Sequence, residues 1–133
     1  MPDIGTRSQK RAQEAYRCVK CVADSQVEEF QGKYGGICRD LPALVHQCGL
    51  GQAVAFLQAK GKSHDHYTRL LEDWGAVSGL GDRSDEIART VREGGDVLKY
   101  QRLTREALAC AEWFDRYAEA LLDAERGHGG GDR

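Results

Sequence analysis

Cysteine and histidine are the residue types in this chain that could hold a metal or carry redox chemistry. Five cysteines occur in 133 residues, and Cys18 and Cys21 form a C-x-x-C pair, a spacing used by zinc sites and redox motifs. Structural zinc sites need a second close pair of ligands, whereas nine residues separate Cys38 from Cys48. The C-x-x-C pair also lies within a helical pattern rather than at a strand-to-helix turn, which disfavours a thioredoxin-like site. We therefore expect no metal site, and a metal- or redox-sensing role for Cys18 and Cys21 is kept only as an alternative.

The histidines and carboxylates do not form a more convincing metal or catalytic site. His64 and His66 are two residues apart, so on a helix their rings would point about 200° apart and could not share a metal. The glycine pairs lack the lysine and the serine or threonine of a phosphate-binding loop. Carboxylates alternate with basic residues at helical spacing, as in Glu112 and Arg116, which is typical of a solvated surface. We expect no enzyme activity, no catalytic residue and no cofactor.

Basic residues gather on two predicted helix faces and could contact phosphate. The first set is Arg7, Lys10, Arg11 and Arg17, and the second contains Arg102 and Arg105. Each set is compatible with an ordinary solvated face, or with contact to a nucleic-acid backbone whose affinity falls with salt. A net charge of −2 and a pI near 6.1 exclude a wholly basic surface, so any phosphate contact must be local.

Large apolar residues are the remaining candidates for a functional surface. The four that we single out are Leu50, Phe56, Trp74 and Trp113. Such residues fill the core of a small helical bundle by default, whereas partly exposed ones anchor a partner protein. Spacing along the chain leaves both interpretations open.

Composition predicts an all-α fold for the elements that position these residues. Ala and Leu together number 27, against 15 for Val, Ile and Thr. Apolar spacing and glycine stops predict helices over about 7–30, from the glycines at 35 and 36 to 47, and over 50–59, 63–74, 85–92 and 96–125. In the first of these, Ala15, Tyr16 and Val19 belong to the apolar stripe. We expect a compact single-domain bundle of about five to six helices over residues 1–126, with a flexible glycine-rich tail over 127–133.

The chain shows no sequence signal for a membrane or for export. No apolar run approaches the roughly 18 residues that a membrane span needs, and the first residues do not form a secretory signal. An odd number of cysteines without such a signal indicates free thiols in a reducing compartment. Helical spacing places Cys18 and Cys21 on the outer side of the first helix, so both thiols should be accessible. We expect a cytoplasmic protein with no membrane contact.

Three stretches of the chain resemble one known family. Residues 6–19 read T-R-S-Q-K-R-A-Q-E-A-Y-R-C-V. Residues 34–57 contain L-P-x-L followed by G-L-G-Q-A-x-A-F, and residues 103–120 contain L-T-x-E-A and a tryptophan. In this order, and over nearly the whole chain, these stretches resemble the small subunit of the Cmr complex, the type III-B CRISPR effector. The small subunit of the sister type III-A complex is the alternative, and the G-L-G-Q-A-x-A-F stretch favours the Cmr family.

The resemblance implies a helical bundle without enzymatic activity. Members of the family stack head to tail with copies of themselves as a minor filament, beside larger Cmr subunits that hold the guide RNA. The partners implied are those subunits, further copies of this chain, the guide RNA and the target RNA. The two basic sets would then contact the RNA backbone, because base pairing with the guide reads the sequence. Cys48 replaces the polar residue common in the family, and residues 75–95 match none of its motifs.

Overall fold

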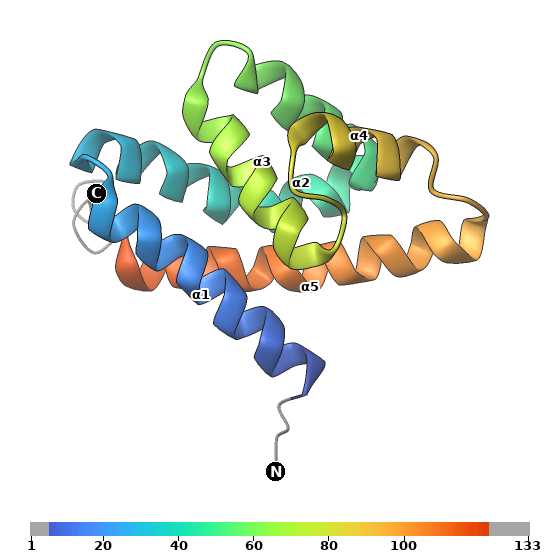
Figure 1. Ribbon diagram of the computed structural model, residues 1–133, viewed down its shortest axis with the longest axis horizontal. Helices are drawn as coiled ribbons and strands as arrows, with labels where there is room; N and C mark the ends of the chain where they lie inside the picture. The colour runs from blue at the N-terminus through green and yellow to red at the C-terminus, as the bar shows by residue number, and fades with distance from the viewer. Residues whose placement is uncertain (1–5, 123–133) are drawn as a thin grey trace.

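The computed structural model describes residues 6–122, which form helices joined by short turns, with no β-strand among them (Figure 1). The helices are α1 (Arg7–Ser25), α2 (Glu28–Gly61), α3 (Asp65–Ser78), α4 (Ser84–Arg92) and α5 (Val97–Leu121). The expected all-α bundle is therefore confirmed. The expected tail at 127–133 lies outside the described residues.

The first helix is shorter than predicted because the chain turns at Gln26. The α1 helix begins with a capping box, in which the Thr6 hydroxyl accepts from the Gln9 backbone N–H and the Gln9 side chain accepts from the Thr6 N–H. Gln26 and Val27 then have extended backbone angles. The Gln31 amide donates to the carbonyl oxygens of Ala23 and Gln26 at 3.0 and 2.7 Å and so holds the turn. The prediction of one continuous helix over 7–30 is wrong for this reason. The spacing of apolar residues cannot reveal a side-chain hydrogen bond that holds a turn.

The second and third predicted helices are two halves of α2. Gly35 and Gly36 do not stop the helix but lie inside it. Gly49 has a φ of 84° and a ψ of 162°, which bends α2 sharply at the predicted glycine stop. At this bend the Gly51 N–H donates to the Tyr100 hydroxyl of α5 at 2.9 Å.

The remaining helices begin close to their predicted positions. The α3 helix begins at Asp65, and His64 rather than Ser63 is its N-cap residue. The α4 helix begins at Ser84, whose backbone N–H and hydroxyl both donate to Glu72 of α3, at 3.0 and 3.2 Å. Asp96 caps α5 by accepting from the Lys99 N–H at 2.8 Å, and α5 ends at Leu121.

The core lies where α2 and α5 pack together, with α1, α3 and α4 completing the bundle around them (Figure 1). Its largest fully buried side chains include Trp74, Tyr34 and Phe114. The Trp74 indole N–H donates to the Ala107 carbonyl oxygen at 2.8 Å, which joins α3 to α5. This packing makes α1 and α5 cross at the surface and brings the two predicted basic sets to one region.

Candidate nucleic-acid interface

Arg11, a predicted phosphate contact, is held by a carboxylate of the same chain. Its Nε donates to Glu106 Oε2 of α5 at 2.7 Å, and its Nη2 donates to Glu106 Oε1. Only 16% of the Arg11 side chain is exposed. These hydrogen bonds lower the pKa of Glu106, against a smaller raising effect of burial. We therefore remove Arg11 from the predicted phosphate contacts, because its guanidinium joins α1 to α5.

The other three cations of the first set are exposed. Arg7 lies with its Nη1 3.9 Å from Glu106 Oε1, but 79% of its side chain is exposed, so this contact leaves it accessible. Lys10 and Arg17 are exposed and form no ion pair with any residue between 6 and 122. They are seven residues apart on α1 and so lie on the same helix face. These three residues remain available for a polyanion.

The second basic set lies beside the first. Arg102 and Arg105 of α5 are exposed, and neither forms an ion pair within the part of the chain that the structure describes. Arg102 is one helical turn before Glu106, the residue that Arg7 and Arg11 contact from α1. The two sets thus come from the two helices that are joined by Glu106.

The four apolar candidates divide between core and surface. Leu50 and Trp74 have no exposed surface, so they are core residues and not contacts for a partner. Phe56 is 42% exposed, stands edge-on to Tyr67 with ring centroids 6.1 Å apart, and has the Lys60 ammonium 5.7 Å from its centroid. Trp113 is partly buried and stacks on Tyr117 with centroids 5.6 Å apart. Phe56 and Trp113 remain candidates for an interface.

Tyr16 is a surface residue that sequence spacing assigned to the core. Its side chain is 42% exposed and stands edge-on to Tyr117 of α5, with ring centroids 5.4 Å apart. Because Tyr117 in turn stacks on Trp113, three aromatic rings form one row across α1 and α5. Helical periodicity placed Tyr16 in the apolar stripe, and only the position of α5 shows that its side chain stays exposed.

The cysteine pair lies at a cleft between α1 and α3. Cys21 is exposed and its Sγ accepts from Arg69 Nη2 at 3.6 Å, whereas Cys18 packs against the core. Two accessible thiols were expected; Cys21 is exposed, whereas Cys18 lines the cleft but is partly buried. Burial raises the pKa of the Cys18 thiol to about 12, so it is not a ready thiolate for redox or metal chemistry.

Asp73 lies in the same cleft and joins α3 to α2. It accepts from the Tyr34 hydroxyl at 2.7 Å and from Arg69 Nε at 3.1 Å, both through Oδ2. Burial raises the pKa of Asp73, although the bond from Tyr34 and the charge of Arg69 act in the opposite direction. The fully buried Tyr34 thereby gains a hydrogen-bond partner, which is a structural role.

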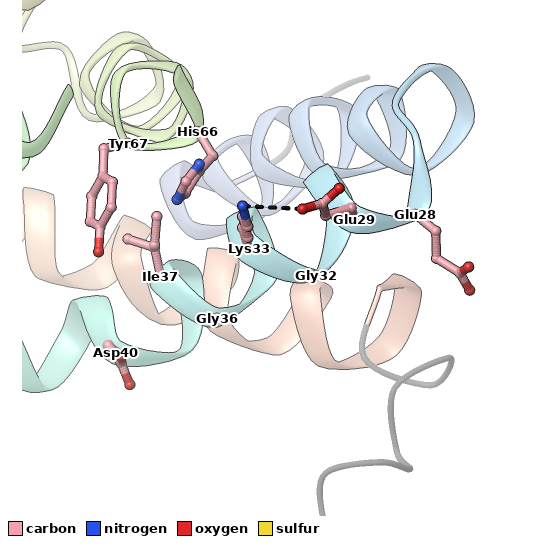
Figure 2. A pocket seen from close by; sticks show the side chains of 9 residues that line it. All are labelled: Glu28, Glu29, Gly32, Lys33, Gly36, Ile37, Asp40, His66 and Tyr67. Atoms are coloured by element: carbon pink, nitrogen blue, oxygen red, sulfur yellow. Dashed lines mark ion pairs between the residues drawn. The ribbon is translucent and has the colours of Figure 1, made fainter. Parts of the chain in front are cut away.

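A larger groove of about 690 Å³ runs along the first half of α2, beneath the start of α3 (Figure 2). Figure 2 shows His66 and Tyr67 facing Lys33 and Ile37 across this groove. Lys33 is paired with Glu29 at 3.3 Å, and Glu28 and Asp40 add further negative charge. An acidic rim of this kind does not suit a phosphate backbone.

His66 of this groove and the neighbouring His64 do not point to opposite sides as predicted. Their ring centroids are 5.7 Å apart, because His64 precedes α3 with an extended backbone instead of lying on the helix. Even so, no group of three or more His, Cys, Asp or Glu residues among positions 6–122 could hold a metal ion. Within the same residues, no helix is long and apolar enough to cross a membrane.

The chain is a small helical-bundle protein, and part of its accessible positive charge lies where α1 and α5 pack together. A family model described as "CRISPR-associated protein (Cas_Cmr5)" matches residues 7–121. The chain belongs to this family, which confirms the resemblance to the small subunit of the Cmr complex.

Named relatives and a solved structure are similar to this chain in sequence or structure over most of its length. A Thermus thermophilus protein named "CRISPR system Cmr subunit Cmr5" is 44% identical over 118 residues, which cover 89% of this chain and 97% of the relative. A Thermotoga maritima protein of the same name is 32% identical over 110 residues, which cover 78% of this chain and 81% of the relative. The crystal structure of a CRISPR-associated Cmr5 family protein from Thermus thermophilus matches with a TM-score of 0.78 and 41% identity, over 89% of this chain and 99% of that chain.

Proposed function

We propose that this chain is a non-catalytic structural subunit of a type III-B CRISPR (Cmr) effector complex. The observation that carries the proposal is the 44% identity to a Cmr subunit along 97% of that subunit's length. The fold agrees in size and shape, since the match to the solved Cmr5 family structure covers 99% of that chain. Such a subunit acts by holding other molecules in place in the cytoplasm, stacked with copies of itself beside the larger Cmr subunits.

Within that complex, the exposed cations at the α1–α5 crossing contact the backbone of the target RNA or of its duplex with the guide. Lys10 and Arg17 of α1 are candidates because they are exposed and lack an ion pair with the described residues, and the same holds for Arg102 and Arg105 of α5. Arg7 is a further candidate, because 79% of its side chain is exposed. Contacts of this kind are blind to sequence and weaken as salt rises, by about 0.7 log units of affinity per log unit of salt for each single-strand phosphate.

The experiment that tests this contact is charge reversal in the assembled complex. The double variant Lys10→Glu with Arg17→Glu removes two exposed cations from α1 without touching the core. We expect weaker capture of target RNA and a salt dependence shallower by about one to two log units per log unit of salt. Lys62→Glu with Arg89→Glu is the matched control, since both side chains are exposed, lie outside α1 and α5, and form no ion pair with the residues that the structure describes. Equal RNA capture by the two double variants would remove the α1 assignment.

A further inference from the structure

A second groove, between α1 and α5, has a lining that differs from the acidic groove along α2. Its volume is about 530 Å³, within the roughly 300–1,000 Å³ range of small-molecule sites. The lining residues are Ala12, Gln13, Tyr16, Arg17, Lys20 and Tyr117. None of these described residues carries a carboxylate, so the groove presents aromatic and cationic groups together.

The two aromatic residues that line this groove, Tyr16 and Tyr117, belong to a row of rings that continues to Trp113. Trp113 and Tyr117 stack with their planes 20° apart, and Tyr16 meets Tyr117 edge-on at 79°. Tyr16 ends the row and is 42% exposed. Because so much of its side chain is uncovered, Tyr16 keeps surface on which a further planar group can stack.

The cationic part lies along the same side of α1. Arg17 and Lys20 line the groove, and Lys10 precedes Arg17 by seven residues on the same helix face. Lys20 is paired with Asp24 at 3.3 Å, whereas Arg17 has no ion-pair partner among residues 6–122. An unpaired guanidinium next to an exposed ring can hold the phosphate of a nucleotide whose base stacks on that ring.

We propose that the α1–α5 groove is a nucleobase subsite, in which one unpaired base of an RNA strand stacks on Tyr16 while Arg17 holds an adjacent phosphate. Aromatic platforms within positively charged grooves are how proteins bind single strands without reading sequence. The inference rests on the proposed RNA contact and adds a preference for unpaired nucleotides. A base inside a duplex already has both faces stacked and cannot enter the groove.

The test is an NMR titration of the full chain with a uridine hexanucleotide. The paired probe is a blunt duplex of a self-complementary G/C hexanucleotide, which contains no unpaired base. Tyr16→Ala should weaken binding of the uridine hexanucleotide by about 5- to 150-fold, the range for losing one base–aromatic stack, and should barely change binding of the duplex. Tyr16→Phe keeps the ring and should bind as the parent chain does. Thermal melts of both variants verify folding, and Tyr16 is exposed enough for the bundle to tolerate either change.

The outcomes separate this subsite from the backbone contact. If Tyr16→Ala binds the hexanucleotide as tightly as the parent chain, the subsite is wrong, even where Lys10→Glu with Arg17→Glu loses RNA capture. Equal loss of both probes in Tyr16→Ala would also overturn it, because no unpaired base would then be recognised. A Tyr16→Ala chain that binds both probes normally but fails to enter the Cmr complex would instead make the groove a docking surface for a protein subunit. If Tyr16→Ala and the double variant Lys10→Glu with Arg17→Glu both bind both RNA probes as the parent chain does, the subsite and the backbone contact are both wrong.

Discussion

At the scale of single residues, Glu106 decides which arginines near the α1–α5 crossing are free to bind a partner. It holds Arg11 with two hydrogen bonds and lies 3.9 Å from Arg7, while Lys10 and Arg17 are outside its reach. The residue types of the basic set were predictable from helical spacing. Their division into occupied and free cations was not, because Glu106 is 95 residues away from Arg11 along the chain.

Replacing Glu106→Gln should lower stability in a pH-dependent way. The pKa of Glu106 is lowered in the folded chain from its ordinary value of 4.5, so its contribution is fully present above pH 4.5 and is lost as pH falls through the lower folded value. We expect the variant to be less stable by about 1.5–3 kcal/mol at pH 7, the range for hydrogen bonds to charged groups. The two unfolding free energies should converge at acidic pH, as measured by urea denaturation.

The control for the comparison of the parent chain with Glu106→Gln is Glu112→Gln on the same helix. Glu112 is exposed and forms no ion pair with the residues that the structure describes, so its loss should change stability little at any pH. Burial raises the pKa of Asp73, so protonation of Asp73 favours the folded state on acidification. Because Asp73 is present in every variant, its contribution cancels when the unfolding free energies of two variants are subtracted. If the difference in unfolding free energy between the parent chain and Glu106→Gln stays constant down to low pH, the charge-based role of Glu106 is contradicted.

At the scale of elements, sequence predicted which segments are helical better than where they stop. The glycine at position 49 was predicted as a stop and bends α2, since its φ of 84° suits glycine alone. The glycines at 35 and 36 were also predicted as a boundary, but packing of the first half of α2 against the rest of the bundle carries the helix through them. Composition cannot distinguish these cases, because the difference lies in what surrounds each glycine.

Two helical glycines should therefore respond oppositely to alanine. A Cβ added at Gly36 meets nothing within 4 Å, so Gly36→Ala should stabilise the chain by about 0.5–1 kcal/mol through helix propensity. A Cβ at Gly75 would lie 2.2 Å from Ile87 Cδ1 and 3.0 Å from the Gly81 carbonyl oxygen, so Gly75→Ala should destabilise by about 1–3 kcal/mol. Thermal melts compare the two directly. A Gly75→Ala chain as stable as Gly36→Ala would show that α3 and α4 do not pack as closely as described.

At the scale of the whole molecule, two grooves of the described surface differ in charge. The groove along α2 is rimmed by carboxylates, whereas the α1–α5 crossing carries free cations and a row of aromatic rings. A chain with a net charge of −2 can therefore present a local surface for RNA without binding nucleic acid over its whole extent. Such a division suits a subunit that meets protein partners on some faces and RNA on another.

The measurement that tests the central claim most directly is affinity purification of the tagged chain from its native host, followed by native mass spectrometry and sequencing of bound RNA. If the chain is a structural Cmr subunit, it should be recovered with larger CRISPR subunits and an RNA of guide length, and the mass gives its copy number. Recovery of the chain alone, or with a bound metal and no RNA, would contradict the account and return attention to Cys18 and Cys21.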